Sequence, residues 1–238
     1  MKIVDAKYYQ PDDSDGDMGF GLVASIENTT ESTVEFIQTS ILLINSQNIS
    51  VGGESDDQHD VFLDPGDSTE LILSTGYGTN ALLFGGDFNK ISAIVDAQLY
   101  RKVSYTLGEI DVPSDANKTV FITKGADIDA MVHILGASIV RSKPSDDGDV
   151  SVTVIVGVRN ISDTFFDKVV VEVALLDEEG SELENNEDYG YLPPRGTKLL
   201  TPGCYTNAGR LRNCKVRITF NLFQPVEYKT GNAIFVQG

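Results

Sequence analysis

The chain has no tryptophan, two cysteines and two histidines in 238 residues, and each shortage excludes a class of site. Two cysteines, Cys204 and Cys214, are too few for a fold stapled by disulfides. By themselves they also lack the four ligands of a structural zinc site. The histidines, His59 and His133, lie in no nucleophile motif, and neither Gly-x-Ser-x-Gly nor a Walker-type glycine loop occurs. We therefore expect a protein that is not an enzyme.

Long apolar runs are missing as well. No stretch approaches the ~20 apolar residues that a membrane-spanning helix needs. The first residues, MKIVDAKYYQPDD, lack the apolar segment and the small-residue cleavage site of a signal peptide. We expect no membrane span, and a place in the cytoplasm or in a virion rather than outside the cell.

Positive charge is scarce. The chain holds 18 Lys and Arg against 36 Asp and Glu, a net charge of −18. Phosphate backbones and anionic membranes attract basic surfaces, so this balance argues against nucleic acid and membranes as partners. The charge is uneven, because residues 1–119 have a net charge of −14 and residues 120–238 have −4. Such a surface suits solubility, high external salt or a basic partner, and composition does not choose among these.

What the chain does contain is an internal repeat. The segments that begin at Asn28 and Asn160 match at a constant offset of 132 residues, with Ile41 opposite Val173. Four further blocks keep the same order while the offset falls to 123: 15–17 with 147–149, 63–65 with 192–194, 79–81 with 206–208, and 99–105 with 222–228. Loop deletions in the second copy would produce this drift. The sequence therefore predicts a duplication.

Each copy has the alternation of β-strands. Phe20, Leu22, Ala24 and Ile26 alternate with smaller or polar residues, and the valines from Val150 to Val158 do the same. About seven short strands per ~110-residue copy is typical of an Ig-like fold. We predict an all-β protein of two tandem Ig-like antiparallel β-sandwich domains. The predicted bounds are 1–112 for the first, 113–131 for a linker or shared strand, and 132–238 for the second.

One stretch of the second copy resembles a known family. The segments 156–162, 173–180 and 192–194 are similar to the FxLYD-type Ig-like domain of bacteria and archaea. The family's Phe-x-Leu-Tyr-Asp is Val-x-Leu-Leu-Asp at 173–177, and the first copy has Ile-Leu-Leu-Ile-Asn at 41–45. The resemblance implies a β-sandwich without enzymatic residues, of a type that is usually secreted or surface-attached.

Acidic residues gather at matching turns in the two copies. Calcium takes several oxygen ligands close together, so these clusters are candidate calcium sites. The glycines do not fall at the EF-hand position, and Asp and Gly also serve a plain hairpin turn. Two interpretations stay open, a solvated turn and a weak calcium site that a partner completes; no other cofactor is expected. The candidate ligands are Asp13, Asp15, Asp17, Asp147 and Asp149.

The cysteines are ten residues apart, and two states are open to them. Tyr77 of the first copy stands opposite Cys204, so the fold does not require the pair. Free buried thiols are one state. A local disulfide that closes the loop to Cys214 is the other, in an oxidising compartment.

A basic run distinguishes the second copy. Arg210, Arg212, Lys215 and Arg217 lie within eight residues, and the alternation from Cys214 to Phe220 predicts that Lys215 and Arg217 lie on an exposed strand face. One interpretation is ordinary surface charge. The other is a docking site for an acidic surface, such as the first copy of a neighbouring subunit. Head-to-tail contacts of that kind close into rings or extend into filaments.

These features favour a non-catalytic structural or interaction protein that acts through protein–protein contacts or self-assembly. One version is a decoration or tail accessory of a virus-like particle. The alternatives are an exported, cell-surface Ig-like binding module, and an acidic inhibitor or DNA mimic that binds a basic partner.

Overall fold

The computed structural model describes residues 1–9, 17–80, 91–116, 118–122 and 125–235. They form antiparallel β-strands and one short 3-10 helix, η3, which confirms the predicted all-β sandwich class. No helix in the part of the chain that the structure describes is long and apolar enough to cross a membrane. The elements are β1 Lys2–Tyr9, β2 Asp17–Glu27, β3 Val34–Ile44, β4 Ser50–Leu63, β5 Ser68–Asn80, β6 Ser92–Asp111, β7 Thr119–Ile122, β8 Ala126–Ile128, β9 Val132–Arg141, β10 Asp149–Asn160, β11 Phe166–Leu176, β12 Glu182–Leu192, β13 Thr197–Leu200, β14 Gly203–Asn207, η3 Ala208–Arg210 and β15 Lys215–Ile234.

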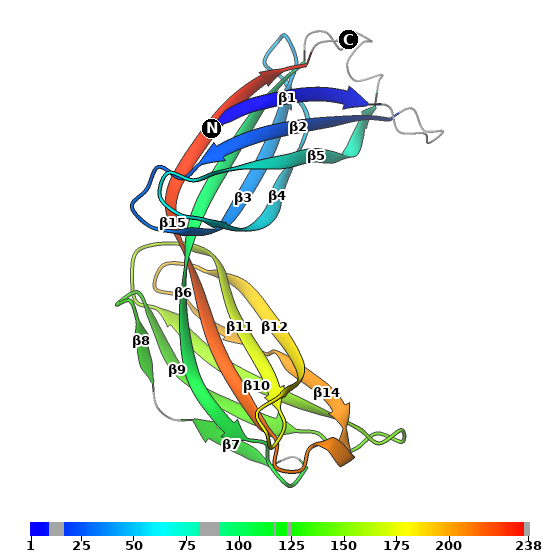
Figure 1. The fold of residues 1–238 in the computed structure, drawn as a ribbon, viewed down its shortest axis with the longest axis vertical. Helices are drawn as coiled ribbons and strands as arrows, with labels where there is room; N and C mark the ends of the chain where they lie inside the picture. Colours follow the sequence, from blue (N-terminus) through cyan, green and yellow to red (C-terminus); the bar gives the residue numbers. More distant parts are fainter. Residues whose placement is uncertain (10–16, 81–90, 117, 123–124, 236–238) are drawn as a thin grey trace. The chain divides into compact units, whose positions relative to one another are not determined.

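The chain divides into two compact units. Unit 1 comprises Met1–Arg101 and Pro225–Gly238, and unit 2 comprises Lys102–Gln224. Strands β6 and β15 are each 20 residues long and give residues to both units (Figure 1). By sequence, unit 1 holds 5 Lys and Arg against 18 Asp and Glu, and unit 2 holds 13 against 18. The net charges are therefore −13 and −5.

Unit 1 encloses one apolar core. Its three-stranded sheet has the order β1-β2-β5, and strands β3 and β4 pair with each other and β3 with β6. The alternating residues of β2 that the sequence singles out, Phe20 to Ile26, are all buried, together with Leu43 and Leu99. Because successive strand residues point to opposite faces, one side of β2 fills the core and the other does not.

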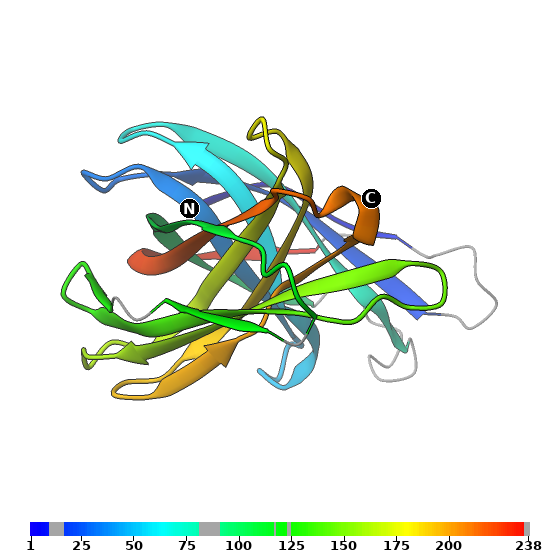
Figure 2. The ribbon, with the colours of Figure 1, turned by 90° about the horizontal axis from the view of Figure 1, so that it is seen from below.

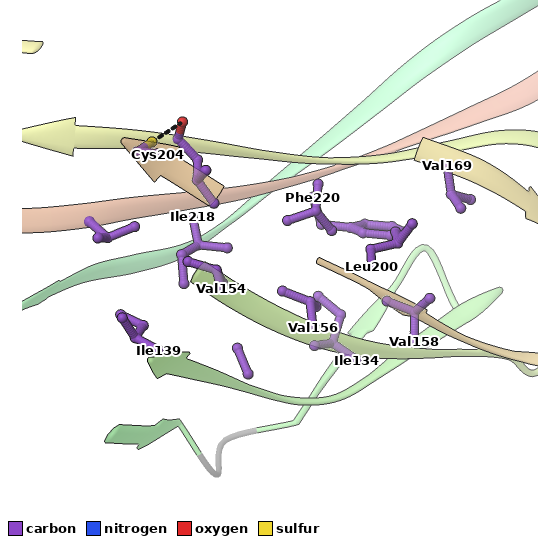
Figure 3. Packing of buried hydrophobic residues seen from close by; sticks show 14 of the residues in the cluster. Ile134, Ile139, Val154, Val156, Val158, Val169, Leu200, Cys204, Ile218 and Phe220 are labelled. Carbon is purple, nitrogen blue, oxygen red and sulfur yellow. Dashed lines mark hydrogen bonds between the residues drawn. The ribbon is translucent and has the colours of Figure 1, made fainter. Parts of the chain in front are cut away.

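Unit 2 has a larger core. One sheet has the order β13-β10-β9-β7, with β14 on β10 and β8 on β9; β11 pairs with β12 and with β15. Figure 3 shows side chains of both groups of strands meeting, with Val154 and Val156 of β10 opposite Ile218 and Phe220 of β15. Fully burying one such side chain contributes about 1.5–3 kcal/mol.

A buried asparagine lies at the end of the second strand of each predicted copy, directly after β2 in the first and as the last residue of β10 in the second. The Asn28 Nδ2 donates to the carbonyls of Ser32 and Leu63, both at 2.9 Å, and its Oδ1 accepts from the N–H and hydroxyl of Thr30. Asn28 and its counterpart Asn160 are both 0% exposed. Buried amides need such partners, so each asparagine holds together the loops around it.

Asn160 repeats this pattern in unit 2. Its Nδ2 donates to the carbonyls of Thr164, Leu192 and Pro193 at 2.7, 3.3 and 3.1 Å, and its Oδ1 accepts from the N–H and hydroxyl of Ser162. The contacts match those of Asn28 at the offsets found in the sequence. The duplication stays a prediction, and these matched contacts support it.

The compact units differ from the predicted domain bounds. The prediction assigned 102–112 to the first domain and 225–238 to the second, whereas these segments belong to unit 2 and unit 1 respectively. The physical reason is that β6 and β15 continue as strands through residues 101–102 and 224–225. The segment 113–131 contains β7 and β8, and both pair with β9 in unit 2.

Candidate interaction surface

The basic run lies on the connection from β14 into β15 in unit 2. Turn η3 begins after Asn207, whose side-chain oxygen accepts a hydrogen bond from the N–H of Gly209 at 3.0 Å. Arg210, Arg212 and Lys215 are exposed. No ion pair is formed by these three cations within the described part of the chain.

The strand alternation explains this exposure. Cys214, Val216, Ile218 and Phe220 are buried in the core of unit 2, so the residues between them lie on the outer face of β15. Lys215 is exposed as the alternation predicts.

Two of these cations line a groove of about 680 Å³. Arg212 and Lys215 share it with Arg141, which comes from β9, and with the carboxylates of Asp111 and Glu178. The Arg141 Nη1 donates to the carbonyls of Pro113 and Ser114 at 3.2 and 2.7 Å, so this guanidinium is tied to the backbone. The groove therefore brings together cations from distant parts of the sequence.

Arg217 differs from the other members of the run. Its Nε and Nη2 donate to Glu109 Oε1 at 3.1 and 2.8 Å. It lines a second groove, of about 530 Å³, together with the carboxylates of Glu172, Glu182 and Glu187. The structure thus separates the four predicted cations into three that are exposed and form no ion pair with the residues it describes, and one that neutralises an acidic neighbour.

The acidic turn between β9 and β10 projects from one end of unit 2, drawn in lime green (Figures 1 and 2). Backbone hydrogen bonds within the turn hold it in shape. The N–H of Gly148 donates to the Ser145 carbonyl at 3.0 Å, and the N–H of Ser145 donates to the Asp149 carbonyl at 2.8 Å. Gly148 has a φ of +82°, which a residue with a side chain rarely adopts. These contacts are those of a hairpin turn.

The candidate calcium ligands do not come together where the structure describes them. Among the described residues, which include Asp147 and Asp149, no group of three or more His, Cys, Asp or Glu side chains could hold a metal ion. Asp13 and Asp15 lie outside the described residues, and Asp17 is the first residue of β2.

Both cysteines are free and buried. Burial raises the pKa of the Cys204 thiol to about 11, and the nearby Glu184 carboxylate adds to the effect. Burial and then Asp177 also raise the pKa of Cys214, whose Sγ donates to the Arg210 carbonyl at 2.9 Å. Because the thiolate is the nucleophile, these thiols suit packing and not chemistry.

The histidines make local contacts. His59 Nε2 lies 3.1 Å from the hydroxyl of Thr39, in unit 1. His133 Nδ1 lies 2.6 Å from Asp127 Oδ1, in unit 2, and joins β9 to β8. Each histidine therefore connects two neighbouring strands.

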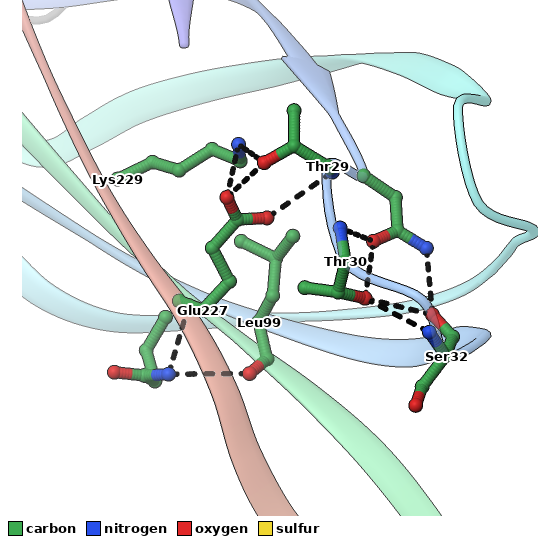
Figure 4. A network of polar contacts seen from close by, with 8 residues as sticks. Thr29, Thr30, Ser32, Leu99, Glu227 and Lys229 are labelled. Carbon is green, nitrogen blue, oxygen red and sulfur yellow. Dashed lines mark hydrogen bonds and ion pairs between the residues drawn. The ribbon is translucent and has the colours of Figure 1, made fainter.

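A polar network in unit 1 surrounds Glu227 of β15 (Figure 4). Lys229 Nζ donates to its carboxylate at 2.8 Å, and the Thr29 N–H donates at 3.2 Å together with the Thr29 hydroxyl. Burial would raise the pKa of Glu227, but these hydrogen bonds and the Lys229 charge outweigh it and lower the pKa below its ordinary value. The Gln98 side chain also donates to the Glu227 carbonyl at 2.8 Å. The network fixes the C-terminal part of β15 to the loop after β2.

A second polar arrangement, along β12, was not predicted from the sequence. Three alternating side chains reach the backbone of the β13–β14 segment. Glu184 accepts from the N–H of Tyr205 at 3.0 Å, Asn186 donates to the carbonyl of Gly203 at 2.7 Å, and Asp188 accepts from the N–H of Thr201 at 2.6 Å. These three residues, the β12 ladder, satisfy backbone groups at the edge of a sheet. Their alternation of polar residues reads in sequence as an ordinary exposed strand.

Comparisons with known proteins leave the family open. No protein-family model matches the chain, and no curated protein matches it, so the resemblance to the FxLYD-type domain stays a prediction. Solved structures match at low similarity. The protein named "pT26-6p" matches at 9% identity and a TM-score of 0.25, over 94% of this chain and 61% of that one. A glycosyl hydrolase family 2 member from Bacteroides cellulosilyticus matches at 10% and 0.32, over 90% and 26%. Red sea bream transglutaminase matches at 9% and 0.24, over 100% and 32%.

The chain thus spans between about a quarter and three fifths of the length of these structures. Similarities at these TM-scores carry no conclusion about its function.

Proposed function

We propose that this protein is a non-catalytic structural or interaction protein that acts through protein–protein contacts. The observation that carries the proposal is the group of exposed cations Arg210, Arg212 and Lys215, which form no ion pair within the described residues. In a protein of net charge −18, such cations are free to meet an acidic partner. Charges at the rim of a contact set its orientation and association rate.

A second copy of the chain is a partner of suitable chemistry. Unit 1 has a net charge of −13, and unit 2 carries the exposed cations. A contact between unit 2 of one molecule and unit 1 of another molecule is heterologous, so it would build rings or filaments. Assembly of this kind would suit a decoration or tail accessory of a virus-like particle.

Sedimentation velocity over a wide concentration range, at low and at high salt, tests the proposal. We expect reversible association that weakens as salt rises, because exposed charges are screened. The double variant Arg212→Glu and Lys215→Glu should lose this association. A matched control, Lys118→Glu and Lys143→Glu, makes the same charge change at exposed lysines elsewhere in unit 2 and should keep it. Association that is equal in both variants would contradict the role of the basic run.

Unit 1 favours a second candidate, an acidic inhibitor or mimic of DNA that binds a basic partner. The observation is its excess of 18 acidic over 5 basic residues. Binding to a basic protein such as a histone, measured against salt concentration, separates the candidates. Affinity that is unchanged by salt would exclude an electrostatic mimic.

A further inference from the structure

In each compact unit, one strand is supplied by a segment that is distant in the sequence from the strands beside it. Unit 1 is contiguous up to Arg101 and is then completed by residues 225–238. The segment 102–111, which follows directly in the chain, belongs to unit 2. We propose that the two copies of the duplicated sequence exchange their last strands, so that each unit consists of one copy plus the last strand of the other. The proposal rests on the duplication and is independent of the basic surface.

Two backbone hydrogen bonds support the exchange. The N–H of Val112 donates to the carbonyl of Cys214 at 2.9 Å, and the N–H of Phe235 donates to the carbonyl of Ile91 at 3.1 Å. Val112 and Phe235 are 123 residues apart, and so are Ile91 and Cys214. This is the offset at which 99–105 matches 222–228. The two bonds are therefore equivalent, and each joins one copy to the other.

Side chains repeat the pattern. Gln98 Nε2 donates to the carbonyl of Glu227 at 2.8 Å, and the Ser104 hydroxyl donates to Asn221 Oδ1 at 2.7 Å. Gln98 corresponds to Asn221, and Ser104 to Glu227, at the same offset of 123. In a tandem pair without exchange, each of these contacts would lie inside one copy.

The exchanged strands also fill equivalent places in the two cores. Val103, Ile110 and Val112 pack against the core of unit 2, and their counterparts at the same offset are part of, or pack against, the core of unit 1. The counterparts are Val226, Ala233 and Phe235. Phe235 is fully buried and packs edge-on against Phe20, with 4.9 Å between ring centroids. Each core is thus incomplete without the strand that the other copy supplies.

The sequence at the junction explains why the first copy does not fold back on itself. A hairpin needs a turn, and short turns use Gly, Pro, Asn or Asp. The segment Leu99–Tyr105 has none of these residues and continues as one strand. A strand that continues straight carries the next ten residues away from its own copy. The partner that fits the open edge of each copy is therefore the last strand of a second copy of the same sequence.

Cleavage of the folded full-length chain tests the exchange. A protease site inserted between Asp115 and Ala116 lies in the connection between β6 and β7, where Asp115 is exposed. Correct folding is checked before cleavage by circular dichroism and elution volume. After cleavage we expect the halves to elute together at the size of the intact 25.8 kDa chain, and to separate only in denaturant. Halves that elute separately under native conditions would overturn the proposal.

A second measurement excludes two folded halves that merely adhere. With exchanged strands, separation of the halves requires unfolding, so dissociation and loss of the β-sheet signal should occur at the same denaturant concentration. Dissociation of halves that keep their β-sheet signal would contradict the exchange. As a matched control, a site inserted between Glu178 and Glu179, in the connection between β11 and β12, cuts within one copy. Its fragments should also stay together until unfolding, which shows that the method detects strand-mediated association.

Discussion

The side chains of Asn28 and Asn160 form hydrogen bonds with backbone groups, the role that a neighbouring backbone has in a sheet. Each is fully buried and connects the loop that follows it to a carbonyl more than 30 residues away. An amide offers two N–H donors and a separate carbonyl acceptor, whereas an ionised carboxylate of the same size only accepts. The position therefore demands asparagine for a structural reason, and a turn residue after a strand is all that the sequence pattern predicts there.

Replacing either asparagine should destabilise its own unit. We expect Asn28→Ala and Asn160→Ala each to lower the free energy of unfolding by about 1–3 kcal/mol, because buried partners lose their hydrogen bonds. Urea denaturation monitored by circular dichroism measures the change. The exposed Asn185→Ala serves as the control and should change stability by less than about 0.5 kcal/mol. Equal effects of all three changes would refute the interpretation.

Glu227 predicts an acid dependence with a definite sign. Its pKa is lowered in the folded chain from an ordinary value of 4.5, so its stabilising effect is present above that value and is lost as the pH falls through the folded pKa. Glu227→Gln should lower the free energy of unfolding by about 1.5–3 kcal/mol at pH 7, the range for hydrogen bonds to charged groups. Below pH 4 the difference from the parent chain should narrow. A difference that stays constant from pH 7 to pH 3 would show that ionisation is not involved.

At the scale of elements, the β12 ladder shields the backbone of β14 and of Thr201, which lies between β13 and β14. A sheet edge with free N–H and carbonyl groups invites pairing with other chains. Glu184, Asn186 and Asp188 occupy three of those groups from the side of the neighbouring strand. These backbone groups are therefore satisfied by side chains, without a further strand paired at the edge.

Removing the ladder should free specific amides. In Glu184→Ala with Asp188→Ala, we expect the N–H groups of Tyr205 and Thr201 to exchange with solvent about fivefold to tenfold faster, since one hydrogen bond is worth about 1 kcal/mol. Amide hydrogen exchange by NMR resolves the two positions. Light scattering should also show stronger self-association. Glu187→Ala changes an acidic residue of the same strand, whereas the hydrogen bonds of these two amides go to Asp188 and Glu184, so it should leave both exchange rates unchanged.

The strands themselves could be predicted from local pattern, and their partners could not. Alternation from Phe20 to Ile26 and from Val150 to Val158 identifies buried strand faces, because burial repeats every second residue. The pairing of Ile91 with Phe235 joins residues far apart in the chain, and no local pattern encodes it. For the same reason the basic run was visible in the sequence, whereas Arg141 in the same groove was not.

At the scale of the whole molecule, the two units have separate cores but share two strands. Phe235→Ala should therefore weaken unit 1 selectively, by about 3–5 kcal/mol as for other buried phenylalanines. Hydrogen exchange should show lost protection at Leu22 and Ala24, with little change at Val154 and Val156. The adjacent Ile234 is 69% exposed, and Ile234→Ala should alter neither unit. Equal loss of protection in both units would contradict this division.

The place of the last strand also reverses the order in which the units are finished during synthesis. Domains usually complete from the N-terminus as the ribosome extends the chain. Here all of Lys102–Gln224 is made before Pro225–Phe235 exists, so unit 2 has every strand it needs while the nascent unit 1 still waits for its final one. The first unit to be translated is the last to close, and its open edge stays exposed until the segment Pro225–Phe235 has been made.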